Sequence, residues 1–407
     1  MSPERGPATF IWRSKRILTP FWLLVAAAGI ACAEPVEQAP ADAWPLARGS
    51  ASGSGRSAMP LSLPLAEHWH RSFEKTAFGA VPVIAGGTIY LGDLDGTFHA
   101  LDLETGATRW SFEAEAAGFP SAAAVSLDPA LPFVIVGDDT GVVRSFDRAT
   151  GKVLWDYETD GEISGGPTIL PAADGLPARV LVGSQDASLA CLALADGAIV
   201  WKHSIADQIR CSPTVVEGHV LIAGCDGKLH VIDAAIGAET AAVPIDGPTG
   251  TTPATASGRI YFGTEGGAFF AIDVEAGAVV WKMRPAANAQ AYRSSAAIAD
   301  GLAIVGTRGN GVEAFTLADG ARGWRRGMRG RVDASPVVVP LADGGRPAAV
   351  VADAAGRIAV LDAATGEPAW EFDAGGGFSA GAAVAAGRMV LASDDGTVWC
   401  FRGPHRK

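Results

Sequence analysis

The sequence predicts an all-β protein, an eight-bladed β-propeller of four-stranded antiparallel blades that is closed by its N-terminal strand. Three observations support this prediction. A unit of two apolar stretches, two glycine-containing turns and a final tryptophan recurs along most of the chain. Successive units follow at about 40–50 residues, a period typical of propeller blades. The last unit lacks its final strand, and a matching strand occurs ahead of the first unit.

The units align in order along the chain. Each has an apolar stretch such as VLIAG, a glycine turn, a second stretch such as LHVID, a second turn and a strand that carries tryptophan. The segment before each unit, such as RCSPTVV, supplies the fourth and innermost strand. In the fourth unit Ala241 replaces the tryptophan. The units span residues 87–110, 133–155, 179–201, 219–241, 259–281, 302–324, 349–370 and 388–403.

The eighth unit stops before its tryptophan strand, and residues 67–73 (EHWHRSF) have the pattern of the missing strand. By completing the last blade, this N-terminal strand closes the ring and removes the exposed edges of an open array. We therefore assign residues 63–402 to the propeller and residues 403–407 to a tail.

The repeated acidic residues are predicted to be turn residues. An aspartate side chain accepts hydrogen bonds from the amides of its own turn, and the glycine four residues later adopts positive φ. Two units have Ala193 or Thr316 at this position, which a turn tolerates and a catalytic acid does not. The stretch Asp93–Gly96 (DLDG) is similar to a calcium loop, but its carboxylates are not repeated in the other units, so it too is predicted to be a turn. The aspartates are Asp102, Asp147, Asp233, Asp273 and Asp362.

The tryptophans are predicted to be structural as well. Large aromatic side chains at one position in each blade are expected to pack between adjacent blades.

Residues 1–33 have the features of an export signal, because basic residues precede an apolar run at 21–33 that is too short to span a bilayer. Ala31-Cys32-Ala33 fits an ordinary signal-peptidase site, and Gly29–Cys32 resembles a lipobox in which Cys32 is lipidated. Either alternative places the protein in the periplasm, at the outer membrane or outside the cell. Residues 34–62, rich in Ala, Pro, Gly and Ser, are predicted to be a tether or lead-in.

Composition excludes some functions. The chain of 407 residues has a net charge of −12 and no Lys/Arg-rich run beyond the N-terminus, so a nucleic-acid partner is not expected. It shows no serine elbow, P-loop or dinucleotide fingerprint. The spacing of the seven histidines does not indicate a metal site. We therefore expect no catalytic, cofactor-binding or metal-binding residues.

Two sets of residues are candidates for special roles. Cys211 and Cys225 flank a predicted hairpin and are expected to lie opposite each other; in an oxidising compartment they form a disulfide or remain two buried thiols. Loop-end polar residues precede the innermost strands of three units and are expected either to bind a ligand or an acidic peptide at the mouth of the central channel, or to form its solvated rim. These are Arg210, Tyr292, Arg293 and Asp333.

The pattern Gly-x-[Leu/Phe/Val]-x-Ala-[Leu/Ile]-Asp-x-x-Thr-Gly-x-x-x-Trp resembles the repeat named after pyrroloquinoline-quinone (PQQ) enzymes. The segment Trp44–Gly49 (WPLARG) is similar to one that precedes many such bacterial propellers. The resemblance covers residues 44–402 and strongly implies the fold. It includes both PQQ-dependent dehydrogenases, which have an adjacent Cys pair, a calcium site and a catalytic Asp, and non-enzymatic propellers.

This chain has no adjacent Cys pair, so it is more similar to the BamB branch of outer-membrane assembly lipoproteins. That resemblance implies a monomeric, non-enzymatic scaffold of the cell envelope with protein partners, no cofactor, and membrane contact only through a lipid anchor. The alternative is a quinone-binding oxidoreductase or a ligand-sensing propeller.

Overall fold

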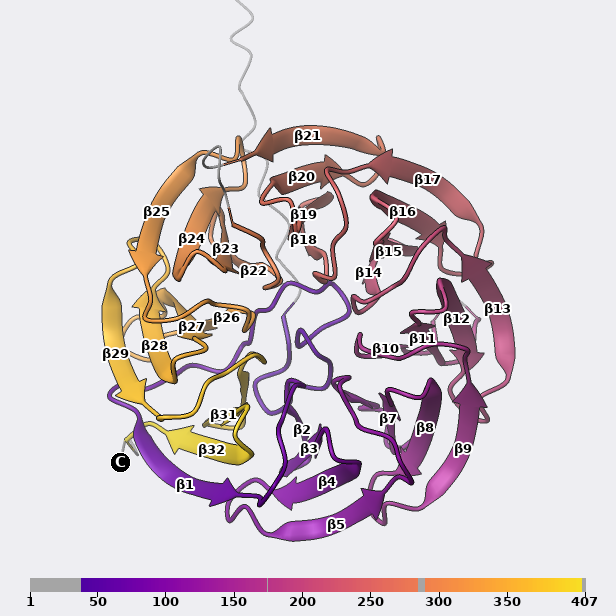
Figure 1. Ribbon diagram of the computed structural model, residues 1–407, viewed down its shortest axis with the longest axis horizontal. Coiled ribbons are helices and arrows are strands. Elements are labelled where there is room, and N and C mark those ends of the chain that lie inside the picture. The colour runs from indigo at the N-terminus through magenta and orange to yellow at the C-terminus, as the bar shows by residue number, and fades with distance from the viewer. Residues whose placement is uncertain (1–37, 174, 285–289, 405–407) are drawn as a thin grey trace, which may run out of the picture. The chain divides into compact units, whose positions relative to one another are not determined.

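The computed structural model describes residues 38–173, 175–284 and 290–404. Its described elements are all β-strands, which form eight four-stranded antiparallel sheets arranged as blades around a central axis (Figure 1). The predicted eight-bladed propeller is therefore confirmed. Within the described ranges, no helix combines the length and the hydropathy needed to cross a membrane.

Each blade is built in chain order from the axis outward, except the last. Blades 1 and 2 contain β2 (Val83–Ala85), β3 (Thr88–Gly92), β4 (Thr97–Asp102), β5 (Thr108–Glu113), β6 (Ala124–Val125), β7 (Phe133–Gly137), β8 (Val142–Asp147) and β9 (Val153–Glu158). Blades 3 and 4 contain β10 (Thr168–Leu170), β11 (Arg179–Gly183), β12 (Ser188–Ala193), β13 (Ile199–Ser204), β14 (Thr214–Val216), β15 (His219–Ala223), β16 (Lys228–Asp233) and β17 (Glu239–Pro244). Blades 5 and 6 contain β18 (Ala254–Ala256), β19 (Arg259–Gly263), β20 (Phe269–Asp273), β21 (Ala278–Met283), β22 (Ala297–Ala299), β23 (Leu302–Thr307), β24 (Gly311–Thr316) and β25 (Arg322–Gly327). Blades 7 and 8 contain β26 (Val337–Pro340), β27 (Pro347–Ala352), β28 (Arg357–Asp362), β29 (Pro368–Asp373), β30 (Ala383–Ala385), β31 (Arg388–Ala392), β32 (Thr397–Arg402) and, as the outermost strand of blade 8, β1 (Ala66–Ser72).

The N-terminal strand closes the ring as predicted. Strand β1 pairs antiparallel with β32, and Trp69 lies opposite Cys400 beside a β-bulge. Figure 1 shows the two ends of the propeller segment side by side in this blade. Because the first and last strands share one sheet, the ring cannot open without breaking that pairing.

The repeated aspartates hold the turn between the third and fourth strands, as predicted. Asp102 Oδ1 accepts hydrogen bonds from the amides of Glu104 and Thr105, and Gly106 adopts a φ of 70°. The hydrogen bond from Arg109 lowers the pKa of Asp102 to about 2. In the DLDG turn, Asp93 Oδ1 likewise accepts from the amides of residues 95 and 97, which confirms that this stretch is a turn.

The tryptophans link neighbouring blades, as predicted. The indole Nε1 of Trp110 in blade 1 donates a hydrogen bond to the carbonyl of Arg148 in blade 2, and the indole ring lies on Gly151 of the same turn. The same link from one blade to the next is made by Trp69, Trp110, Trp155, Trp201, Trp281 and Trp324, whose rings face Gly106, Gly151, Gly197, Gly237, Gly320 and Gly366. In blade 4 Ala241 stands in this position and faces Gly277.

The hydrophobic core lies between the blades. Phe98 of blade 1 stacks on Phe146 of blade 2 with ring centroids 5.4 Å apart, and Phe119 from the connecting loop packs against Phe98. All three side chains are buried. Since each blade buries one face against each neighbour, stability is shared around the ring rather than held in one central core.

We expect Gly151→Ala to lower the free energy of unfolding by about 2–4 kcal/mol. The new Cβ lies 2.6 Å from the Trp110 ring, and φ is +71°, so a steric clash adds to backbone strain. Gly277→Ala is the matched control, because its φ is also positive (+56°) but its Cβ faces Ala241 at 3.2 Å. Urea denaturation measures both. Equal losses in the two variants would contradict the role given to the tryptophan contact.

Candidate functional site

The two ends of the ring differ in the connections they carry. At one end, the connection face, lie the loops from the outermost strand of one blade to the innermost strand of the next, together with the turns between second and third strands. At the other end, the hairpin face, lie the turns from first to second and from third to fourth strands. Any site on the axis is therefore bounded by two chemically different surfaces.

Residues 38–62 fill part of the central channel, and we call this segment the plug. Figure 1 shows the plug, in indigo, winding through the middle of the ring. It pairs with the innermost strands of six blades, which otherwise present unpaired backbone groups to the channel. The amides of Ile84, Val125, Val215, Thr255, Ile298 and Val338 donate to carbonyls of Trp44, Pro45, Ala51, Ser52, Ser54 and Gly55, respectively.

Residues 34–62 were predicted to be a tether or lead-in, and the structure packs the described part of this segment, residues 38–62, inside the ring. Trp44 is fully buried, and Gly55 adopts a φ of +63° beside the guanidinium of Arg48. An added Cβ at Gly55 would lie 2.8 Å from Arg48 Cζ, and one at Gly53 would lie 2.9 Å from Thr214 Oγ1. The small residues that indicated flexibility are therefore the ones that fit a narrow channel.

Above the plug, a cavity of about 260 Å³ opens toward the connection face. All eight blades line it, mainly with glycine, alanine and serine, and Arg48 lies at its base on the plug side. Adjacent blades are linked here through hydroxyl groups: the amide of Ser212 donates to Thr252 Oγ1, and the amide of Thr252 donates to Ser295 Oγ. Sequence reasoning missed these hydroxyl links, although a Ser or Thr precedes the inner strand in several units.

Three of the four residues expected at the channel mouth line this cavity. Arg210 donates to Gln208, Arg293 pairs with Glu265 at 3.5 Å, and Asp333 accepts from Arg308 at 3.1 Å. Arg293 and Asp333 are thus each paired with an opposite charge, whereas Arg210 bonds to a neutral amide. Ligand or acidic-peptide binding at these residues stays a prediction.

The prediction for Tyr292 is wrong. Its side chain is buried between blades, its hydroxyl donates to Glu313 Oε2 at 2.6 Å, and its ring packs on Gly263. Burial strongly raises the pKa of this hydroxyl. In several other blades the residue at this position is apolar and packs on the equivalent glycine, as Phe119 does on Gly92 and Ile163 on Gly137. Alignment of this position across the units was the signal that could have placed Tyr292 in the core.

Arg48 carries a charge that the fold leaves deeply buried. Its Nη2 donates to the carbonyls of Ala296 and Pro336 at 2.8 and 2.9 Å, so the plug is fixed to the inner ends of blades 6 and 7. Burial lowers the pKa of Arg48 to about 9. The WPLARG segment therefore has a structural role in which Trp44 and Arg48 are its anchors.

Cys211 and Cys225 are not bonded to each other in the structure. Cys211 Sγ lies 3.6 Å from the carbonyl oxygen of Ala223, and Cys225 Sγ lies 3.8 Å from that of Thr249. Both residues lie just outside the paired part of β14 and β15, where no ladder register aligns them. In the structure both are free thiols, Cys211 buried and Cys225 half-buried, and the choice between a disulfide and two thiols stays a prediction. Cys32, the predicted lipidation site, lies outside the described residues.

The fold and the channel define an eight-bladed propeller of PQQ-like repeats whose channel is partly filled by its own N-terminal segment. The family described as outer membrane protein assembly factor BamB matches residues 66–169, 138–240, 185–327 and 308–403, and this chain belongs to it.

The chain is similar to several known members and structures. BamB of Yersinia pestis is 29% identical over 167 residues, which cover 37% of this chain and 41% of that protein. The chain thus spans less than half the length of the curated relatives it matches first. The crystal structure of BamB from Moraxella catarrhalis gives a TM-score of 0.66 at 18% identity and covers 84% of this chain and 99% of that one. Quinohemoprotein alcohol dehydrogenase from Comamonas testosteroni gives 0.70 at 14% identity, with coverage of 90% and 81%. Since BamB and an alcohol dehydrogenase both fit at low identity, these structures show the fold alone.

We expect Gly55→Ala to loosen the plug, because the new Cβ displaces the Arg48 guanidinium in addition to straining a positive φ. Hydrogen exchange of the blade amides that donate to the plug should accelerate about 10-fold beyond a Gly218→Ala control, a factor equal to about 1.4 kcal/mol. Gly218 has a φ of +77° and no atom within 4 Å of the added Cβ. Unchanged exchange at Val125, Val215 and Ile298, whose amides bond to the plug, would contradict this account.

We expect the thiols of Cys191, Cys211 and Cys400 to react far more slowly than Cys225 with a thiolate-specific reagent at neutral pH. Burial raises the pKa of Cys191 to about 11 and of Cys211 and Cys400 to about 12, so their thiolate forms are rare. Cys225 is half-buried. Peptide mass spectrometry after brief labelling of native protein measures the order. A Cys211–Cys225 disulfide would instead leave both residues unlabelled until a reductant is added.

Proposed function

We propose that this protein is a non-enzymatic protein-interaction scaffold of the bacterial cell envelope with a BamB-like role in outer-membrane protein assembly. Membership of the BamB family supports the role. Because the aligned relatives are of low identity and are only partly spanned, the partners are inferred from the surface of this chain.

The observation that carries the proposal is the distribution of exposed apolar side chains. Among the described residues, nine large apolar side chains are exposed, and only Leu94 belongs to the connection face. The others lie in the turns of the hairpin face or at the adjoining ends of outermost strands, all in blades 2–5. They are Leu127, Leu154, Leu176, Ile199, Val200, Ile236, Val279 and Val280. Apolar side chains that gather on one part of a surface are typical of protein-interaction sites.

A pocket of about 310 Å³ lies on the same face, between the plug and blades 2 and 3. Its lining includes Leu46 of the plug together with Val125, Leu127, Ile169 and Leu194. A pocket of this kind accepts one large apolar side chain of a partner, which is how the most strongly contributing residues of protein interfaces are usually bound. The plug thus contributes directly to the candidate docking surface.

The quinone-binding alternative has less support from the channel. Its cavity of about 260 Å³ is smaller than common cofactor pockets of roughly 300–1,000 Å³, and its described lining contains neither an aromatic ring nor a cysteine to lie against a planar quinone. Three arginines and one aspartate give it charge but no stacking surface. Tight binding of PQQ with calcium, seen as a new absorption band, would contradict the scaffold proposal.

We expect the purified protein to capture the barrel-assembly machinery from detergent-solubilised outer membranes of its own bacterium. A variant with Leu127→Glu, Ile199→Glu and Ile236→Glu should capture at least 10-fold less. The substitutions place charge in an apolar interface, which weakens binding by about 1.4 kcal/mol or more. Leu94→Glu is the matched control on the opposite face, with 44% exposure. Circular dichroism checks that each variant is folded. Equal capture by the triple variant and the control would contradict the surface, and absence of any assembly protein would contradict the role.

A further inference from the structure

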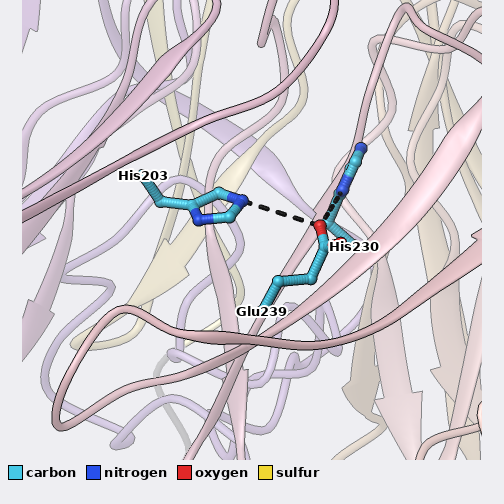
Figure 2. Close-up of side chains that lie close together, drawn as sticks. All are labelled: His203, His230 and Glu239. Atoms are coloured by element: carbon cyan, nitrogen blue, oxygen red, sulfur yellow. Dashed lines mark hydrogen bonds and ion pairs between the residues drawn. The ribbon is translucent and has the colours of Figure 1, made fainter.

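Three potential metal ligands converge between the outer strands of blades 3 and 4. His203 belongs to β13, His230 to β16 and Glu239 to the start of β17. Figure 2 shows the two imidazole rings pointing at one carboxylate oxygen from opposite sides. Glu239 Oε2 lies 2.6 Å from His230 Nδ1 and 3.6 Å from His203 Nε2, and one ligand atom from each residue fits within 4.8 Å of the others.

A second carboxylate fixes the orientation of His230. Its other ring nitrogen, Nε2, lies 3.1 Å from Asp226 Oδ2, and both side chains are about 4% exposed. A ligating histidine that donates its remaining N–H to a buried carboxylate is the usual support of protein metal sites. With Asp226 accepting from Nε2–H, the lone pair of Nδ1 is directed at the point where His203 and Glu239 meet.

The arrangement without a cation leaves an imbalance. The Nε2 atom of His203 is buried and makes no hydrogen bond, so one buried nitrogen is unsatisfied. Two carboxylates, Asp226 and Glu239, face His230 at the same time, and only a doubly protonated ring donates to both. A divalent cation resolves both features, because it accepts the His203 lone pair, replaces the proton on His230 Nδ1 and neutralises Glu239.

Blade 1 shows that the Asp–His pair alone does not make such a site. His99 Nε2 lies 3.0 Å from Asp93 Oδ2, in the same relation as His230 and Asp226. There, however, the ring of Phe73 packs on His99 with centroids 4.7 Å apart, and Thr108 stands in the register position of Glu239. What distinguishes the blade 3–4 junction is the addition of His203 and Glu239.

We propose that His203 Nε2, His230 Nδ1 and a carboxylate oxygen of Glu239 bind one Zn²⁺ ion, with Asp226 as the positioning residue. Two imidazole nitrogens and one carboxylate oxygen are a ligand set that zinc accepts in tetrahedral geometry, with water as the fourth ligand. Bond lengths of about 2.0–2.1 Å place tetrahedral ligand atoms about 3.3 Å apart. On binding, the Glu239 oxygen therefore moves away from His230 Nδ1, now 2.6 Å distant, while the three ligand atoms, now within 4.8 Å of one another, settle at that spacing. Glu239 is 35% exposed, which allows that movement and leaves room for the water.

The proposed ion joins two blades. His203 comes from blade 3, while His230 and Glu239 come from blade 4, so bound zinc crosslinks the outer strands β13 and β17. This site lies outside the channel and is independent of the scaffold function. Its expected consequence is a zinc-dependent increase in the stability of the native ring.

We expect full-length protein, first stripped by a chelator, to take up one Zn²⁺ per chain in calorimetry and elemental analysis, with a rise in melting temperature. His203→Ala and Glu239→Gln should weaken binding more than 10-fold and abolish the rise. Asp226→Asn should retain the site with affinity 10–100-fold lower. His70→Ala, which removes an exposed histidine paired with Glu67, should bind as the wild type does.

Cobalt absorption distinguishes metal binding from a purely structural role of these residues. Co²⁺ in the proposed site should give the visible absorption of a tetrahedral complex, and His203→Ala should remove that band while circular dichroism stays unchanged. The proposal is overturned if stripped protein binds no zinc, or if His203→Ala and Glu239→Gln bind it as tightly as His70→Ala. In either case the cluster is an ion-pair network that joins the blades without metal.

Discussion

The link between each tryptophan and the next blade sets the geometry of the ring. An indole lies flat on a glycine and donates to a carbonyl of the same turn, so one contact fixes both the distance and the angle between neighbours. The glycine is required because its positive φ shapes the turn and its missing Cβ leaves space for the ring. Because similar links are repeated around the axis, the last blade lies next to the N-terminal strand β1, which pairs with β32 and completes that blade.

Closure creates a second constraint at the axis. The innermost strand of each blade has one free edge, and eight such edges face the channel with unpaired amides. The plug satisfies many of them in turn, as its carbonyls accept from the amides of Val125, Val215 and Ile298. A segment that passes so many edges must be narrow, which explains why small residues predominate in it, with Trp44 and Arg48 as buried anchors.

The parts of this structure that were predictable are those that repeat. Turn aspartates, blade-linking tryptophans and strand closure each leave the same signal several times, so substitutions such as Ala241 did not obscure them. Features that occur once were missed. Tyr292 was placed at the channel mouth by its polarity, although its position in the unit is an apolar packing position.

The plug and the histidine cluster were not predictable for different physical reasons. The composition of residues 38–62 is that of a flexible linker, and only a channel of matching width makes it ordered. His203 and Glu239 belong to different units, and their proximity depends on the twist between blades rather than on spacing within one unit. The local sequence pattern therefore predicts the fold, whereas contacts between units can be predicted only from the assembled ring.

The same division separates the fold from its use. All eight blades share the repeat, so the repeat itself carries no functional distinction, and both an alcohol dehydrogenase and BamB superimpose on it. Function must then come from departures from the repeat: a filled channel, exposed apolar side chains mostly at or beside the hairpin face of four blades, and one junction with an extra histidine and glutamate. The plug ties these together, because it occupies the axis and lines both the channel cavity and the proposed docking pocket. In such a protein, residues on the outer surfaces can change under selection without disrupting the contacts between blades.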